Sequence, residues 1–89
     1  MQIETLSNFK KSYTKRFRHN KKIVIKINRR IDLFRNDPKN PILDDHSLKG
    51  SKIGYRSFSI TGNIRIIYLP ISPSKVLFYD IGTHNQVYN

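Results

Sequence analysis

Residues 55–81, YRSFSITGNIRIIYLPISPSKVLFYDI, decide the fold of this 89-residue chain. Three runs rich in β-branched and aromatic residues cover 55–60, 64–69 and 75–81, and turn sequences rich in Gly, Asn, Pro and Ser separate them. Short turns between such runs predict an antiparallel meander. One face of that sheet needs an apolar cover, and the other face can stay open.

The segment before the meander predicts two helices that supply this cover. After a short strand around 3–6, Ser7 or Asn8 can cap a helix whose aromatic residues recur every four positions. A second helix carries an apolar stripe and ends at Asn36-Asp37-Pro38, because the residue before a proline is pushed out of the α region. The two apolar sets are Phe9, Tyr13 and Phe17, and Ile23, Val24, Ile27, Ile31 and Phe34. We predict an α+β fold in one domain of residues 1–89, with two N-terminal helices in a hairpin packed on a small antiparallel β-sheet.

The composition describes a small basic protein without cysteine. At 37% hydrophobic residues the chain can bury one core, and zero cysteines exclude a disulfide framework and thiolate metal sites. The N-terminus lacks the apolar segment of a signal peptide, and the longest apolar stretches, such as Ile23-Val24-Ile25, are too short to cross a bilayer. We expect a cytoplasmic protein without a membrane partner.

The formal net charge of +11 lies mainly in the first part of the chain. Residues 1–40 hold twelve Lys and Arg against three acids, a net +9, whereas residues 41–89 hold five against three, a net +2. A basic surface of this kind favours a nucleic acid backbone or an acidic protein partner. The side chains expected to dock on RNA are Lys10, Lys11, Lys15, Arg18 and Lys22.

The acids and histidines do not form a recognisable metal site. Asp44 and Asp45 are adjacent and Asp80 is isolated, which does not suit a two-metal nuclease. The three histidines lack the local spacing of zinc ligands, and neither a P-loop nor a dinucleotide-binding glycine motif occurs. We expect no metal and no cofactor.

The remaining chemistry is metal-free phosphoryl transfer within RNA, in which a ribose 2′-hydroxyl attacks its own 3′-phosphate. The reaction needs a base, donors for the charge on the phosphorane, and an acid for the leaving 5′-oxygen. Imidazole can be base or acid near neutral pH, and arginine grips two phosphate oxygens. His46 precedes the first meander strand and His84 follows the last, so the two could face each other. Alternation lets Arg65 reach the open face if Ile66 is in the core.

Four ordered motifs resemble the RelE/ParE superfamily of bacterial toxins from toxin–antitoxin pairs. They are Leu48-Lys49-Gly50, Gly54-Tyr55-Arg56, Ile64-Arg65-Ile66-Ile67-Tyr68, and Gly82-Thr83-His84 followed by Tyr88. The chain is most similar to the YafQ-like branch, whose loop and terminal histidine motifs correspond to Asp45-His46-Ser47-Leu48 and Gly82-Thr83-His84. The similarity covers nearly the whole chain.

The resemblance implies a ribosome-dependent mRNA endonuclease that is a monomer when free and is held inactive in a hetero-oligomer with an acidic antitoxin. The catalytic residues implied by motif are His46, His84, Arg65 and Tyr88. The substrate-binding residues expected beside them are Arg56, Lys49, Lys52, Ser57 and Ser59. The branch has an acid and a histidine where this chain has Ser57 and Ser59, and an arginine where it has Ile81. We expect Arg65 to compensate for that missing arginine.

Two other classes of function stay open. A ParE-like inhibitor of DNA gyrase would act by protein contact alone, although that branch does not need the two histidines. A non-catalytic basic RNA-binding protein would also explain the charge. A platform like that of an RNA recognition motif is disfavoured, because the strands lack a clustered pair of aromatic residues in the sequence.

Overall fold

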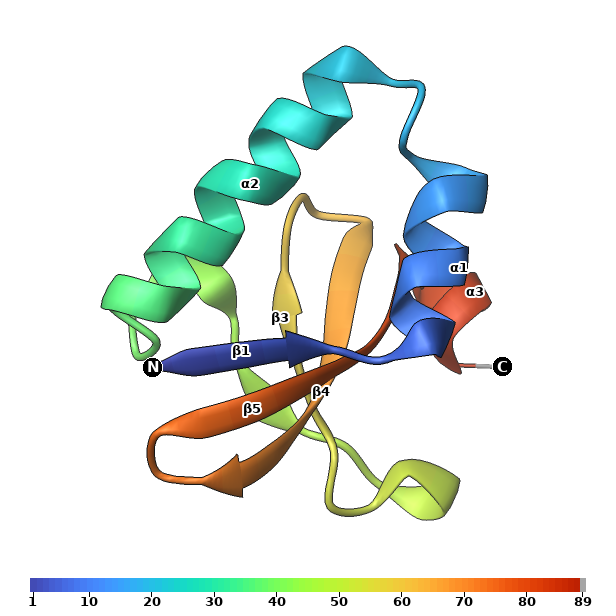
Figure 1. Ribbon diagram of the computed structural model, residues 1–89. Coiled ribbons are helices and arrows are strands. Elements are labelled where there is room, and N and C mark those ends of the chain that lie inside the picture. Colours follow the sequence, from blue (N-terminus) through green and yellow to red (C-terminus); the bar gives the residue numbers. More distant parts are fainter. Residues whose placement is uncertain (89) are drawn as a thin grey trace.

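The computed structural model, which describes residues 1–88, places two helices across one face of a five-stranded sheet (Figure 1). The strands are β1 (Gln2–Thr5), β2 (His46–Ser47), β3 (Arg56–Ser59), β4 (Ile64–Ser72) and β5 (Lys75–Thr83). The helices are α1 (Ser7–Arg16), α2 (Lys21–Asn36) and α3 (His84–Tyr88), with short 3-10 turns η1 (Pro41–Leu43) and η2 (Gly50–Lys52). The predicted α+β class and the helix pair are confirmed. No helix in the described part of the chain is long and apolar enough to cross a bilayer.

The sheet order is β1-β5-β4-β3-β2, and β3, β4 and β5 form the predicted antiparallel meander. The expectation of a wholly antiparallel sheet is wrong in one respect, because β1 pairs with β5 in parallel, with Ile3 opposite Val76. The chain leaves β1, passes through both helices over one face, and returns to the sheet through the meander, which leaves β5 beside β1. The sequence of a four-residue strand does not reveal this direction.

The two helices begin differently, and the cap predicted for the first is wrong. Asn20 caps α2, since its side-chain oxygen accepts a hydrogen bond from the Ile23 backbone N–H at 3.2 Å. Neither Ser7 nor Asn8 caps α1; Leu6 is the N-cap and makes no side-chain bond. The Asn8 side chain instead donates to the Tyr79 carbonyl over 2.9 Å, which ties the start of α1 to β5.

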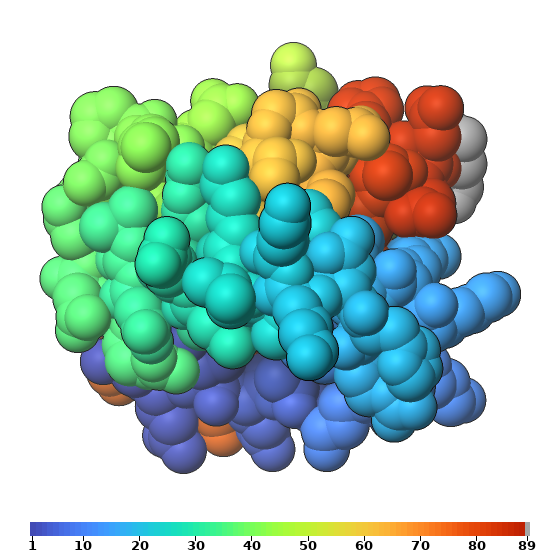
Figure 2. All heavy atoms as spheres, turned by 90° about the horizontal axis from the view of Figure 1, so that it is seen from above, coloured from blue at the N-terminus to red at the C-terminus, as the bar shows by residue number. Residues whose placement is uncertain are grey.

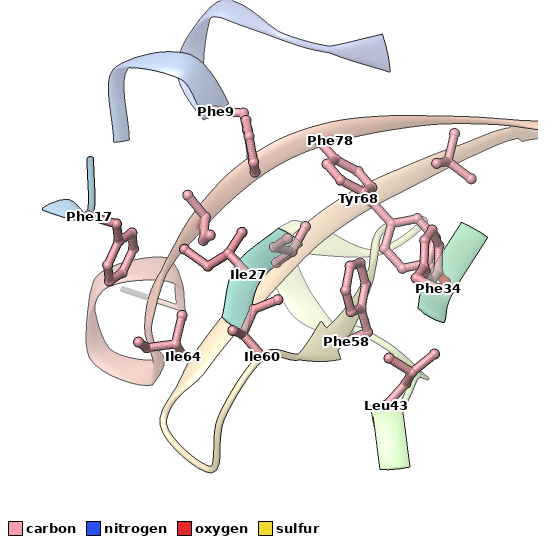
Figure 3. Packing of buried hydrophobic residues seen from close by; sticks show 13 residues of the cluster. Phe9, Phe17, Ile27, Phe34, Leu43, Phe58, Ile60, Ile64, Tyr68 and Phe78 are labelled. Atoms are coloured by element: carbon pink, nitrogen blue, oxygen red, sulfur yellow. The ribbon is translucent and has the colours of Figure 1, made fainter. Parts of the chain in front are cut away.

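The core lies between the two helices and one face of the sheet, here called the helix face (Figure 3). Phe34 of α2 stacks on Phe58 of β3 with ring centroids 4.3 Å apart and meets Tyr68 edge-on at 4.9 Å. The ring centroid of Phe9 in α1 lies 5.4 Å from that of Phe78 in β5. Burying each of these rings contributes about 1.5–3 kcal/mol, so the aromatic cluster fixes the helices on the sheet.

The last helix, α3, was not expected from the sequence. It follows β5 directly and packs where Gly82 leaves space: a Cβ at Gly82 would lie 2.7 Å from Arg16 Nη1 and 2.8 Å from Gln86 Oε1. Arg16 donates to the Ile81 carbonyl at 2.8 Å, and Val87 of α3 is fully buried. A side chain at position 82 would therefore displace the ends of Arg16 and Gln86, which hydrogen-bond where α1, β5 and α3 meet.

Candidate active site

A row of side chains joins β2, β3 and α3 on the sheet face opposite the helix face, here called the open face. His46 lies directly opposite Ser57, so the two side chains project from the same face. The Tyr88 hydroxyl donates to Ser57 Oγ over 2.8 Å, and the Tyr88 ring meets the His84 ring edge-on with centroids 4.4 Å apart. Ser57 is fully buried and Tyr88 half-buried. The fold thus links the two histidines through Ser57 and Tyr88.

Asp44 holds His46 and fixes which ring nitrogen is free. The Nδ1 atom of His46 lies 2.9 Å from the Asp44 carbonyl oxygen, which can only accept, so Nδ1 carries the hydrogen of this bond. The neutral imidazole then presents the Nε2 lone pair to solvent, since the residue is exposed. An imidazole oriented in this way is ready to accept a proton.

Arg65 adds a guanidinium to the same face. It lies opposite Ser59 on β3 and Gly82 on β5, two residue pairs along from the row that contains Ser57. Its Nη1 is 3.5 Å from Asp44 Oδ2, a weak contact, and its side chain is 16% exposed. Within residues 1–88 its one side-chain partner is Asp44, at long range, so the guanidinium can turn toward an anion. Ile66 next to it belongs to the core cluster on the helix face, as the condition stated from the sequence requires, although Ile67 is fully buried as well.

Asp44 can serve both side chains because its backbone is left-handed, with φ 47°. Aspartate tolerates this region better than most residues, and the turn ends η1 just before β2. The carbonyl group then reaches His46 while the carboxylate reaches toward Arg65. The conformation of one residue thus sets the relative position of an imidazole and a guanidinium.

The neighbouring Asp45 makes a separate network on the helix face. Its carboxylate accepts from Arg56 Nε at 2.8 Å and from the Tyr68 hydroxyl. Burial raises the pKa of Tyr68, and the hydrogen bond to Asp45 raises it further. Desolvation alone would lower the pKa of Arg56, but the bonds to Asp45 and Tyr68 outweigh it and raise that pKa. Both groups therefore keep their protons, and the network anchors the residue before His46.

A pocket of about 590 Å³ opens beside this network. Its lining comes from the 38–45 loop together with the Arg56 and Tyr68 side chains. Within residues 1–88, no group of three or more His, Cys, Asp or Glu side chains is arranged to hold a metal ion.

The whole chain, residues 1–89, matches the family model described as the bacterial toxin of type II toxin–antitoxin system, YafQ. The chain belongs to the YafQ family. The resemblance predicted from the motifs is therefore confirmed, and this protein is a toxin of the type II toxin–antitoxin class. No curated protein matches the chain in sequence.

Solved structures share the fold of this YafQ-family toxin. YafQ from E. coli strain BL21(DE3) is 24% identical, with a TM-score of 0.77 over 99% of this chain and 98% of that one. A YoeB/ParE toxin from Agrobacterium tumefaciens is 25% identical, with a TM-score of 0.75 over 94% of this chain and 99% of that one. The YafQ chain of an E. coli DinJ–YafQ complex is 24% identical, with a TM-score of 0.74 over 99% and 98%.

The fold of this YafQ-family toxin brings together four residues predicted as catalytic and separates one predicted substrate contact from them. Arg56 pairs with Tyr68 across the strands, so its side chain projects from the helix face, away from Ser57. The two predicted serines are buried, and Ser57 is already bonded to Tyr88. The two lysines on the loop before β3 make no hydrogen bond or ion pair with the four predicted catalytic residues within residues 1–88. Lys49 is exposed, and Lys52 lies over the Tyr79 ring.

The five basic residues predicted for docking are all exposed. In Figure 2, side chains of α1 and α2, coloured blue to teal, form much of the face seen there. The docking residues Lys10, Lys11 and Lys15 also line a hollow of about 490 Å³ on α1. They stay a predicted surface of this YafQ-family toxin.

Sequence reasoning missed the two aspartates that organise the site. From the sequence we consider Asp44 and Asp45 as metal ligands and Asp45 as part of the loop motif, whereas in the structure Asp44 orients His46 and Asp45 binds Arg56 and Tyr68. The Asp-Asp-His order itself was the available signal. Successive residues of an extended segment point to opposite faces, so this order places the two aspartates on different faces of the sheet.

Proposed function

We propose that this YafQ-family toxin is a metal-independent mRNA endonuclease that acts on the ribosome. The observation that supports it most strongly is the gathering of two imidazoles, a phenol and a guanidinium on one sheet face. These groups supply a base, an acid and a cation, the three functions that cleavage by a 2′-hydroxyl needs. The resemblance of the sequence motifs to the RelE/ParE superfamily implies the same reaction.

In the proposed reaction, His46 Nε2 takes the proton from the ribose 2′-hydroxyl as that oxygen attacks the adjacent phosphorus. Arg65 leaves Asp44 and binds the charged phosphorane oxygens. Protonated His84 gives its proton to the leaving 5′-oxygen, and Tyr88 holds the His84 ring in place. The products are an RNA end with a 2′,3′-cyclic phosphate and an end with a 5′-hydroxyl. The bond between phosphorus and the 5′-oxygen breaks as the bond between the 2′-oxygen and phosphorus forms.

The proposed partners follow from charge and from the relatives. Solved structures include DinJ–YafQ from E. coli and YoeB–YefM from Staphylococcus aureus. We propose that an acidic antitoxin covers the basic helices of this toxin, whose formal net charge is +11. Its affinity should fall across a salt series, and a complex insensitive to salt would contradict a mainly electrostatic interface.

The test uses toxin that has been treated with EDTA and dialysed, then added to ribosomes translating a defined mRNA. We expect cleavage at full rate, with 2′,3′-cyclic or 3′-phosphate ends on the upstream fragment. A double His46→Ala, His84→Ala variant is the control and should not cleave. Loss of activity that only added metal restores, or ends with 3′-hydroxyl, would contradict the proposal. Trapping of DNA gyrase without RNA cleavage would place the protein with ParE-like inhibitors.

A further inference from the structure

A pair of tyrosines lies outside the proposed reaction. The Tyr55 and Tyr79 rings have centroids 5.3 Å apart and are tilted by 57°. The Lys52 ammonium lies 5.8 Å from the centre of the Tyr79 ring. Both tyrosines are half-buried, and neither hydroxyl makes a hydrogen bond within residues 1–88. The expectation that this chain lacks a clustered aromatic pair is therefore wrong, because folding brings together residues that are far apart in sequence.

A β-bulge aims Tyr79 at this position. Tyr68 pairs with Phe78 and Ile67 pairs with Asp80, so Tyr79 is the extra residue on β5. Phe78 belongs to the core on the helix face, and Tyr79 therefore projects from the open face. Its carbonyl, left without a strand partner, accepts from Asn8. The contact with α1 thus stabilises the bulge that presents the ring.

The pair lies beside the candidate active site. Tyr55 precedes Ser57 by two residues, which places both side chains on the open face about 7 Å apart along the strand. The Leu48 backbone N–H donates to the Tyr55 carbonyl at 3.0 Å, so this level of the sheet continues the row that contains His46. A nucleotide next to one held at the active site can reach these rings.

We propose that the Tyr79 ring, with Tyr55 packed at an angle against it, is a stacking platform for one unpaired base of the RNA, adjacent to the scissile phosphate. The proposal rests on the proposed function, since that function supplies the ligand. Aromatic faces beside a basic surface are the usual means of holding single-stranded RNA. The base displaces the Lys52 ammonium from Tyr79, and the flexible lysine then pairs with the neighbouring phosphate.

The experiment measures binding of a short, 2′-O-methylated single-stranded RNA, which cannot be cleaved, to the purified toxin at low salt. Tyr79→Leu keeps an apolar side chain without an aromatic face and should lower affinity about 5- to 100-fold, while Tyr79→Phe should bind like the wild type. Inorganic polyphosphate has charge but no bases, so its affinity should not change. Tyr55→Leu is the second variant and should act in the same direction. Thermal unfolding confirms that each variant folds.

Wild-type affinity for the RNA in Tyr79→Leu, an equal loss toward polyphosphate, or no binding of the RNA by the wild type would each overturn the platform. Cleavage on ribosomes is measured separately. A toxin that stacks RNA but does not cleave mRNA would refute the proposed function alone. A toxin that cleaves mRNA, with Tyr79→Leu binding RNA normally, would refute the platform alone.

Discussion

At the scale of single residues, two adjacent aspartates divide the work of the site. Asp44 serves the open face, where it bonds to His46 and approaches Arg65. Asp45 serves the helix face, where it binds Arg56 and Tyr68. The two residues that precede His46 are therefore fixed on opposite faces of the sheet. The proposed reaction and the attachment of the loop to the helix face can be tested independently, because they involve different side chains.

His84→Ala should lower the single-turnover rate of mRNA cleavage on saturating ribosomes by about 100-fold or more, because the leaving oxygen loses its proton donor. Arg65→Ala should lower the same rate because the phosphorane loses its cation. Ribosome binding should change little. His19→Ala, on the exposed corner between α1 and α2, is the matched control and should cleave normally. A folded His84→Ala protein with the wild-type rate would remove His84 from the reaction.

Tyr68→Phe should change how stability depends on pH. The pKa of Tyr68 is raised in the folded protein, so its contribution is complete below the unfolded pKa of about 10 and is lost as pH rises above that value. The difference in unfolding free energy between wild type and variant should therefore shrink between pH 9 and pH 11, roughly. Urea unfolding at each pH measures it. A difference that stays constant would contradict the raised pKa.

At the scale of elements, the sequence predicted what depends on local pattern. The apolar stripe of α2 and the β-branched runs of β4 and β5 need only their own neighbours to be recognised. The direction of β1, the bulge at Tyr79 and the helix α3 depend on contacts with distant residues, which no local pattern contains. The motif resemblance predicted His46, Arg65, His84 and Tyr88, but the face of Arg56 required the strand register.

Gly82→Ala should loosen α3. The added methyl group would press on Arg16 and Gln86, and overpacking of this kind costs about 1–3 kcal/mol. The cleavage rate should fall as well, because α3 carries His84 and Tyr88. Urea unfolding gives the stability change. Gly62→Ala is the matched control, since nothing lies within 4 Å of its Cβ position, and it should be neutral. Equal stability in both variants would contradict tight packing at Gly82.

At the scale of the whole molecule, charge and chemistry lie on different surfaces. The exposed lysines of α1 lie on the helix layer, whereas His46, Arg65 and Tyr88 belong to the open face of the sheet. A large polyanion can therefore bind to the helices without covering the residues that are proposed to react. The two surfaces should respond differently to salt and to substitution.

Reversal of charge at Lys10 and Lys11 to Glu should weaken ribosome association in a salt-dependent way and leave the saturated cleavage rate near that of the wild type. Sedimentation with ribosomes across a salt series measures the first effect. Arginine at both positions keeps the charge and is the control. A slower saturated rate with normal association would assign these lysines to the reaction instead.

The parallel pairing of β1 with β5 has a kinetic consequence. Gln2 lies opposite Lys75, so most of the chain must close as one loop before this pair forms, whereas the meander joins close neighbours. We expect the meander to form with the folding nucleus and β1 to dock last. Until then one edge of β5 offers unpaired backbone groups, a template on which another chain can pair.

Ile3→Ala should accordingly speed unfolding and leave the folding rate almost unchanged in stopped-flow measurements. Slower folding would place β1 in the nucleus. Newly made toxin therefore stays prone to aggregation until β1 docks, and the rate of docking sets the length of that period.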